Sequence, residues 1–437
     1  MRIVVITAGT GSFHCGSCMR DNALVAELCR QGHDALLVPL YLPMVLDEDE
    51  ATPNAPLFYG GINVYLQQKT GLFQKTPRVL DKVLDSPGLL RAAAGRAGMT
   101  SARELGQITV SMLSGEDGRQ VKELDKLTDW LHKETPDVVC LSNALLIGLT
   151  RQIKHRTGAP VVCTLQGEDY FLDGLPESYR FTAWEILAER AAEADHFIAV
   201  SHYYGDVMRR RATLAPGKVT VVHNGIVLDG YGPASSPPDP PVLGYLARMC
   251  ALKGLGTLIE AFILLKGTDR IPGLKLRVAG SQTATDREYV SGLQKRLANE
   301  GLADDAEFLP NIEKNEKIAF LQSLSVLSVP ATYGESFGLY VIEALAAGVP
   351  VVQPRHAAFP ELIEMTGGGL LCEPDDPQSL ADRIVELLSD PGRAREMGEN
   401  GRQVVFKEFS VQRMADNVLS VLAGVSNKAG KSSPKVA

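Results

Sequence analysis

Residues 334–350 read Gly334-Glu335-Ser336-Phe337-Gly338-Leu339-Tyr340-Val341-Ile342-Glu343-Ala344-Leu345-Ala346-Ala347-Gly348-Val349-Pro350. This stretch follows an apolar run that ends at Pro330, and its pattern predicts a strand, a loop, a helix and a further strand. Ser336 is placed to cap the helix, which leaves the backbone amides of Phe337, Gly338 and Leu339 at its positive end. Because such a helix start binds phosphates and sugar hydroxyls, the stretch predicts a ligand site beyond a strand end.

Two carboxylates belong to this stretch. If helical rise applies from Glu335 to Glu343, about 12 Å separates them along the axis. One carboxylate would then reach a sugar ring while the other reaches a ribose. Gly338, which lacks a side chain, would let the ligand approach the backbone closely.

A second group follows the first strand of the second half, within residues 244–254. Its cations are Arg248 and Lys253. A diphosphate leaving group gains negative charge as its bond to a sugar breaks, and two nearby cations stabilise that charge without a metal. Taken alone, such a pair is typical of a solvated surface. The segment around Glu335 is what favours a binding site.

Apolar runs typical of strands alternate with helical patterns, which predicts an α/β fold with parallel sheets covered by helices. The Pro-rich stretch 233–241 divides these runs, and it predicts a linker because neither a helix nor a central strand tolerates so many prolines. The first half contains runs at 3–6, 35–38, 138–141, 161–165, 197–200 and 219–222, and the second half at 242–246, 276–279, 307–309, 326–329, 349–352 and 370–372.

The 437 residues are too many for one ordinary core, so we expect two Rossmann-like domains. They would cover 1–232 and 242–410. Because parallel sheets bind ligands beyond the carboxyl ends of their strands, the two domains would face each other across a cleft. A last helix over 411–425 is expected to pack back on the first domain, and 426–437 to form a flexible tail.

A helical insertion over about 56–121 interrupts the alternation. Basic side chains lie among its leucines, namely Lys69, Lys75, Arg78, Lys82, Arg91, Arg96 and Arg103. Such a segment could be an acceptor site or a helix on a membrane surface. The plainer alternative is a solvated helical hairpin over the edge of the sheet.

The composition is that of a folded globular protein, with 45% hydrophobic and 22% charged residues. The formal net charge of −8 gives no overall field that would attract nucleic acid or an anionic membrane. No run has the length of a signal peptide or a spanning helix, and the odd number of cysteines, 7, fits reduced thiols. We therefore expect a cytoplasmic protein, with weak peripheral contact at the inner face of the membrane left open.

A short glycine turn, Thr7 to Ser12, follows the first strand, and Gly11 would let the backbone approach a ligand. The next residues are Phe13-His14-Cys15-Gly16-Ser17-Cys18-Met19-Arg20-Asp21-Asn22. Cys-x-x-Cys beside a histidine is compatible with a metal or redox role. No second Cys or His pair at ligand spacing accompanies it. We favour close packing, with contacts to an acceptor from His14, Arg20, Asp21 or Asn22.

These constellations, in this order, resemble the retaining glycosyltransferases of family 4, the group 1 type with the two-domain GT-B fold. The resemblance is dense from Val242 to about Asp390 and includes 346–352, Pro360-Glu361, Gly369-Leu370-Leu371 and Asp376-Pro377. It is thinner in the first half, where it covers the first strand with its glycine turn and His223-Asn224-Gly225-Ile226.

The resemblance implies that 1–232 is the acceptor domain and 242–410 the donor domain, and it implies a role for each matching residue. Arg248 and Lys253 would bind the donor diphosphate, and Glu335 with the amides of residues 337–339 the donor sugar. Glu343 would bind the ribose. The donor phosphate would help to deprotonate the acceptor on the face from which it leaves, so the sugar carbon keeps its configuration and no carboxylate nucleophile is required. The expected reaction moves a hexose from a nucleoside diphosphate, UDP being the commonest, to a hydroxyl of a glycan, lipid or small molecule.

Neither a metal nor a cofactor is expected beyond this co-substrate. Residues 47–50, Asp-Glu-Asp-Glu, contain the Asp-x-Asp of metal-using transferases, but they lie in an acidic loop among prolines. A solvated face explains that run better.

Three positions depart from the family pattern. Gln166 stands where many members have a histidine that contacts the donor sugar, although its amide can still donate a hydrogen bond. His223 replaces a common proline before Asn224, and the triplet 357–359 replaces glycines before Pro360-Glu361. The pocket walls therefore differ, and the sugar is not identified by the motifs.

Two other functions are compatible with the same residues. A sugar-nucleotide epimerase or hydrolase on this fold would turn over donor without an acceptor. A catalytically silent nucleotide-sugar-binding protein, which Gln166 suggests, would bind donor and transfer nothing.

Overall fold

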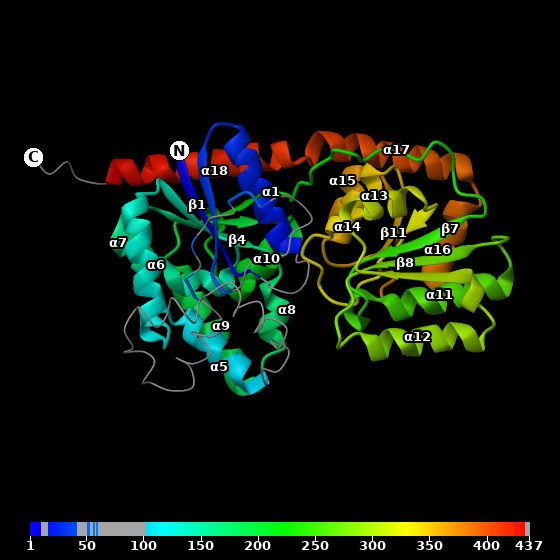
Figure 1. The fold of residues 1–437 in the computed structure, drawn as a ribbon, viewed down its shortest axis with the longest axis horizontal. Coiled ribbons are helices and arrows are strands. Elements are labelled where there is room, and N and C mark those ends of the chain that lie inside the picture. The colour runs from blue at the N-terminus through cyan, green and yellow to red at the C-terminus, as the bar shows by residue number, and fades with distance from the viewer. Residues whose placement is uncertain (10–15, 42–49, 53–55, 57, 60–101, 433–437) are drawn as a thin grey trace, which may run out of the picture. The chain divides into compact units, whose positions relative to one another are not determined.

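The computed structural model describes residues 1–9, 16–41, 50–52, 56, 58–59 and 102–432. The chain divides into two compact units: unit 1 comprises Met1–His223 with Met414–Ala437, and unit 2 comprises Asn224–Arg413 (Figure 1). Residues 224–232, expected in the first domain, thus belong to unit 2. They do so because Ile226 pairs with Ser410 in a parallel bridge and Tyr231 reaches Glu343, both within unit 2.

Unit 1 is built on a six-stranded parallel sheet in the order β2-β1-β3-β4-β5-β6. Its strands are β1 (Arg2–Thr7), β2 (Asp34–Pro39), β3 (Val138–Leu141), β4 (Val161–Leu165), β5 (His196–Ala199) and β6 (Val219–Val221). The central strands are almost continuously buried because helices cover both faces of a parallel sheet, which explains their unbroken apolar runs. All the strand positions expected in this half are confirmed.

The helices of unit 1 connect these strands. They are α1 (Gly16–Arg30), α5 (Ala102–Leu113), α6 (Val121–Glu134), α7 (Thr150–Thr157), α8 (Glu168–Asp173), α9 (Glu177–Ala191) and α10 (His202–Arg211), with short 3₁₀ turns at Gly115–Asp117, Ala144–Leu149 and Pro216–Lys218. Of the expected insertion, most lies outside the described residues, including six of the seven basic residues named above; the seventh, Arg103, lies in α5. Its last part forms α5, which packs on α9.

Unit 2 has a second six-stranded parallel sheet in the order β12-β11-β10-β7-β8-β9. The strands are β7 (Val242–Leu246), β8 (Lys275–Gly280), β9 (Ala306–Pro310), β10 (Val326–Leu327), β11 (Val351–Pro354) and β12 (Gly369–Cys372). The runs expected at these places are confirmed, although β10 is shorter and β11 begins after Pro350. The order reverses between β7 and β10, which is the topological switch point of a doubly wound sheet.

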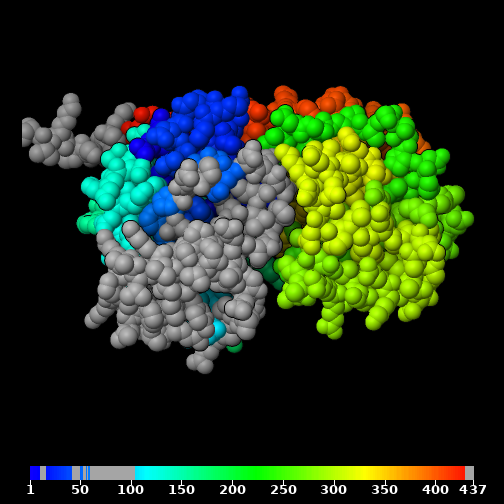
Figure 2. Space-filling model, viewed as in Figure 1, coloured from blue at the N-terminus to red at the C-terminus, as the bar shows by residue number. Residues whose placement is uncertain are grey.

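The helices of unit 2 cover both faces of this sheet. They are α11 (Leu255–Thr268), α12 (Arg287–Asn299), α13 (Lys314–Gln322), α14 (Leu339–Ala346), α15 (Phe359–Thr366), α16 (Pro377–Leu388) and α17 (Pro391–Glu408), with 3₁₀ turns at Ala251–Lys253 and Ala303–Asp305. Figure 1 shows α11 and α12 on one side of the sheet and α14 and α15 on the other. Figure 2 shows the same view as a space-filling surface, on which the segments of unit 2 appear in green, yellow and orange.

The last helix differs from expectation in its length. It is α18 (Val411–Ser432), so residues 426–432, expected in a flexible tail, are helical. From Met414 onward it belongs to unit 1, where Asp416 accepts a hydrogen bond of 3.0 Å from Gln31. Its buried residues recur at helical spacing, namely Met414, Ala415, Val418 and Leu422. Residues 233–241 contain neither helix nor strand, as a linker requires.

Candidate functional site

The switch point of unit 2 brings together the two segments that the sequence singles out. β7 and β10 are neighbours, and the loops after them carry Lys253 and Glu335 respectively. α11 leaves β7 on one side of the sheet and α14 leaves β10 on the other (Figure 1), and doubly wound sheets bind ligands at such a switch point. Arg248, Lys253, Glu335, Glu343 and the start of α14 are hereafter called the candidate donor site.

Lys253 and Glu335 form an ion pair in this site. Nζ of Lys253 lies 2.5 Å from Oε2 of Glu335 and 2.6 Å from the hydroxyl of Tyr333. The hydroxyls of Tyr340 and Tyr333 donate to the same Oε2 at 2.9 and 3.0 Å. Two tyrosines that the sequence analysis left without a role therefore fix the carboxylate.

Backbone contacts hold these two loops against each other. The amide of Thr332 donates to the carbonyl of Leu252 at 2.9 Å. Gly254 has a φ of 72°, and a Cβ there would lie 1.8 Å from the carbonyl oxygen of Pro330. Only glycine permits this approach, so the residue after Lys253 sets the distance between Lys253 and the loop of Glu335.

The protonation state of Glu335 follows from its surroundings. Glu335 is 7% exposed, and this burial acts to raise the pKa of its carboxyl group. The charge and hydrogen bond of Lys253, with the hydroxyls of Tyr340 and Tyr333, outweigh burial and hold the pKa of Glu335 below its ordinary value. Burial and the Glu335 charge raise the pKa of Tyr333 and Tyr340. The site therefore holds a carboxylate, two neutral phenols and an ammonium group.

Arg248 is held by a carboxylate that the sequence analysis did not identify. Its Nη2 and Nε lie 3.0 and 3.1 Å from the two oxygens of Asp286, whose Oδ2 also accepts from the hydroxyl of Thr283 at 2.6 Å. The Arg248 side chain is 47% exposed. It is thus oriented at the surface of unit 2 and accessible to a ligand.

The start of α14 differs from the prediction. The helix begins at Leu339, and its cap residue is Gly338, with a φ of 94° and no capping side chain. The prediction that Ser336 caps the helix is wrong, because the chain turns into the helix through a left-handed conformation that favours glycine. Glu335 precedes the helix, so a helical rise does not apply between it and Glu343. Leu339 provides the first helical amide, and Phe337 is buried in the turn before it.

Glu343 lies on α14 and has partners from two other segments. Its Oε1 accepts from Nζ of Lys317, on α13, at 2.8 Å and from the hydroxyl of Tyr231 at 3.4 Å. Both side chains of the ion pair are mostly buried. No motif near Glu343 predicts Lys317 or Tyr231 as its partners, because each of them lies far from Glu343 in the sequence.

The polar residues at the start of α1 are buried inside unit 1. Arg20 and Asp21 are 4% and 0% exposed and pair at 2.8 Å, while Ser142, after β3, also donates to Asp21. Burial raises the pKa of Asp21 despite Arg20. Asn22, 1% exposed, accepts from the amide of Ala51 at 2.8 Å. These side chains contact their own unit rather than facing solvent. Gly11 and His14 lie outside the described residues.

Gln166 joins the same interior. Its amide donates to the carbonyl of Ser142 at 2.7 Å. Glu168, a buried residue that the sequence analysis did not assign, accepts from the amides of Gln166, Gly167 and Ala144 and from the hydroxyl of Tyr204. Burial raises the pKa of Glu168. This carboxylate holds the loop after β4 against the segment after β3, a strand that borders the switch point of unit 1 between β1 and β3.

His223 and Asn224 close the list of expected site residues. The ring of His223 stands edge to face with His202 at 6.0 Å, in unit 1. Asn224 is 5% exposed and begins unit 2.

Among the described residues, no group of three or more His, Cys, Asp or Glu side chains is placed to hold a metal ion. The six cysteines in this part of the chain are free thiols. No helix within the described ranges is long and apolar enough to cross a membrane.

Two family models match the chain. "Glycosyl transferases group 1" covers residues 233–404, and "Glycosyltransferase Family 4" covers residues 103–229. The alpha-maltose-1-phosphate synthase of Mycolicibacterium smegmatis is 30% identical over 280 residues, which are 57% of this chain and 67% of that protein. The N-acetyl-alpha-D-glucosaminyl L-malate synthase of Bacillus anthracis is 34% identical over 120 residues, 27% of this chain and 32% of that protein.

Solved structures with the same fold cover almost the whole chain. The sucrose-phosphate synthase of Thermosynechococcus elongatus superposes with a TM-score of 0.72 at 20% identity, over 98% of this chain and 100% of that one. Anabaena Alr3699/HepE in complex with UDP gives 0.68 at 18% identity, over 97% and 100%. With the family matches and two doubly wound units, these likenesses show that the chain is a glycosyltransferase of family 4, the group 1 type, with the GT-B fold.

Proposed function

We propose that the protein is a retaining, metal-independent glycosyltransferase that moves a hexose from a nucleoside diphosphate, preferably UDP, to an acceptor hydroxyl. The observation that carries this proposal is the Lys253–Glu335 ion pair at the switch point of unit 2, 2.5 Å long and next to the start of α14. The solved structures of HepE contain UDP, UDP with glucose, or UDP-glucose, which supports a donor of this class here.

The cations would bind the diphosphate. Lys253 lies on the loop after β7, where it contacts Glu335, and Arg248 lies on the same loop with an exposed guanidinium. As the bond to the sugar breaks, charge gathers on the diphosphate, and these two groups stabilise it where a metal would otherwise be needed. Glu343 would accept hydrogen bonds from the ribose.

Glu335 would orient the sugar. Lys253, Tyr333 and Tyr340 all contact its Oε2, so we infer that Oε1 accepts a sugar hydroxyl. The amide of Leu339 at the helix start would donate to another hydroxyl or to the phosphate. An acceptor that attacks from the side of the departing phosphate gives up its proton to that phosphate, and the configuration at the sugar carbon is retained.

Product analysis tests this function. Purified protein would be screened with nucleotide sugars and glycan, lipid and small-molecule acceptors, and the product's anomeric configuration read by NMR. We expect the donor's configuration and an unchanged rate after treatment with EDTA. An inverted product, or loss of transfer that added metal restores, would contradict the proposal.

The same assay separates the other two functions. Turnover of donor without any acceptor would indicate an epimerase or hydrolase, and binding without transfer in the whole screen would indicate a silent sensor. A cytoplasmic location and peripheral membrane contact stay predictions from the sequence.

A further inference from the structure

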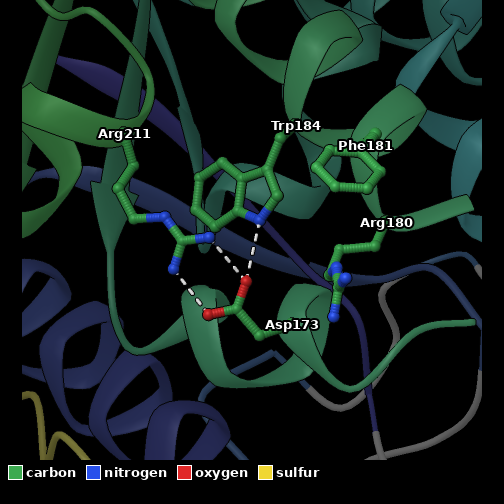
Figure 3. Close-up of a pocket in the computed structure, with 5 residues that line it drawn as sticks. All are labelled: Asp173, Arg180, Phe181, Trp184 and Arg211. Atoms are coloured by element: carbon green, nitrogen blue, oxygen red, sulfur yellow. Dashed lines mark hydrogen bonds and ion pairs between the residues drawn. The ribbon is translucent and has the colours of Figure 1, made fainter. Parts of the chain in front are cut away.

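A hollow of about 450 Å³ lies on the surface of unit 1 and includes no residue of the candidate donor site. It is lined by Asp173, Arg180, Phe181, Trp184 and Arg211 (Figure 3). These residues come from the end of α8, the first turns of α9 and the end of α10. The volume lies within the range of roughly 300–1,000 Å³ that is usual for small-molecule sites.

One wall of the hollow is fixed by Asp173. Its two oxygens accept from both terminal nitrogens of Arg211 at 2.5 Å, and one also accepts from the indole of Trp184 at 3.1 Å. The Arg211 guanidinium lies 4.0 Å from the centre of the Trp184 ring. Burial acts to raise the pKa of Asp173, but the hydrogen bonds from Arg211 and Trp184 outweigh it and lower that pKa. This wall is therefore formed before any ligand binds.

The other wall is open to solvent. Phe181 is 60% exposed, more than any other large apolar side chain in the described part of the chain. The Arg180 guanidinium lies 5.2 Å from the centre of its ring, and no carboxylate of the described residues is within ion-pair distance of that guanidinium. Figure 3 shows Trp184 between Arg211 on one side and Phe181 with Arg180 on the other.

Charge and shape together select the ligand. Two guanidinium groups face one carboxylate that already has two partners, so the hollow carries net positive charge. Guanidinium forks bind phosphate or carboxylate in pairs of hydrogen bonds. The aromatic rings offer apolar surface to the C–H face of a sugar ring. A nucleobase would stack less well, because Arg211 already covers a face of Trp184.

We propose that this hollow binds a sugar that carries a phosphate or a carboxylate, with the anion on Arg180 and Arg211 and the ring against Phe181 and Trp184. The binding of this ligand does not depend on the proposed function.

Tryptophan fluorescence gives a local measurement of binding. The sequence has two tryptophans, so Trp130→Phe leaves Trp184 as the single fluorescent indole. Trp130 packs on Phe58, and neither residue lines the hollow. The full chain with this substitution would be titrated with glucose 6-phosphate, glucuronate, glucose, inorganic phosphate and UMP. We expect saturable changes with the two anionic sugars, and binding at least about tenfold weaker for glucose and for phosphate. No response to either anionic sugar, or tighter binding of phosphate alone or of UMP, would overturn the proposal.

Phe181, which is exposed, and Arg180, which is half-buried, test the assignment at positions outside the core. In the same background, Arg180→Gln and Phe181→Ala should each weaken binding of glucose 6-phosphate at least about fivefold. Phe406→Ala is the matched control, because Arg402 lies 5.1 Å from the Phe406 ring on α17 outside any part of this hollow. Equal binding by all three variants would refute the site.

Calorimetry with UDP on the same proteins separates this proposal from the previous one. Binding of UDP should be unchanged by Arg180→Gln and Phe181→Ala. Failure of UDP to bind the parent protein, with glucose 6-phosphate still bound, would reject the donor site and leave the hollow standing. The reverse pattern would reject the hollow and leave the donor site standing.

Discussion

Nζ of Lys253 and Oε2 of Glu335 lie 2.5 Å apart although 82 positions separate the two residues in the chain. The contact exists because β7 and β10 are adjacent, so the loops after them leave the sheet at the same edge. Glu335 is mostly buried, and burial of its negative charge without a cation would cost folding free energy. The pair therefore holds the loops after β7 and β10 together, and its Lys253 provides positive charge for a diphosphate.

Breaking this pair should separate stability from transfer. Lys253→Met leaves a buried carboxylate without its cation, and we expect a loss of about 2 kcal/mol in unfolding free energy. Adding Glu335→Gln should recover most of that stability because the charge is gone. Transfer should fall at least about 100-fold in the single and the double variant. Calorimetric unfolding and release of UDP measure the two effects, and near-normal transfer by the double variant would contradict the assignment.

Acidification should reduce the contribution of Glu335 to the stability of unit 2. Since its folded-state pKa is lowered below the ordinary 4.5, its contribution to stability is fully present above that pH and is lost as the pH falls through the lowered value. Glu335→Gln lacks this contribution at every pH. The difference between the calorimetric transitions of the two proteins should therefore shrink on acidification below 4.5. A constant difference would show that Glu335 does not titrate in this window.

Glu343 and Lys317 should affect the nucleoside and not the diphosphate. Glu343→Gln removes a charged acceptor for the ribose and should weaken binding of UDP about tenfold. Binding of pyrophosphate, which has no ribose, should stay the same. Lys317→Met should act in the same direction, because Glu343 loses the cation 2.8 Å away. Calorimetry with both ligands provides the measurement, and equal losses for UDP and pyrophosphate would refute the ribose role.

Gly338 should tolerate no side chain without strain. Its φ of 94° lies where L-residues are disfavoured, so Gly338→Ala should destabilise unit 2 by about 1–2 kcal/mol and weaken UDP binding through a shifted helix start. Gly292→Ala is the control in the same unit, since it lies within α12 with nothing within 4 Å of the added methyl group. That change should stabilise by up to about 1 kcal/mol. Thermal unfolding compares the two, and equal shifts would contradict the strain argument.

The sequence predicts both sheets because buried parallel strands must be continuously apolar, and such runs are local. It brings Lys253 and Glu335 to one place for the same reason, since each follows a strand. It does not reveal Asp286, just before α12, or Lys317, on α13, because both look like ordinary charged residues and reach the site from other elements. Arg20 and Asp21 were expected to contact an acceptor, because polar side chains usually lie on an exposed face. They are instead paired inside unit 1, where burial decides their role.

The start of α14 shows the limit of cap preferences. Ser336 has the better capping side chain, but a helix starts where the backbone allows it to, and the left-handed turn at Gly338 fixes that place. Sequence preference for a cap is weaker than this conformational requirement.

Because α18 supplies unit 1 with buried Met414, Ala415, Val418 and Leu422, the first unit is made of the two ends of the chain. During translation, residues 1–223 leave the ribosome long before this helix is synthesised. Unit 2, whose residues are contiguous, is complete earlier than unit 1. An N-terminal domain usually finishes folding first, but here unit 1 can be completed only after unit 2. A gene fragment that stops at His223 would encode unit 1 without α18, so the apolar surface that this helix covers would be exposed to water.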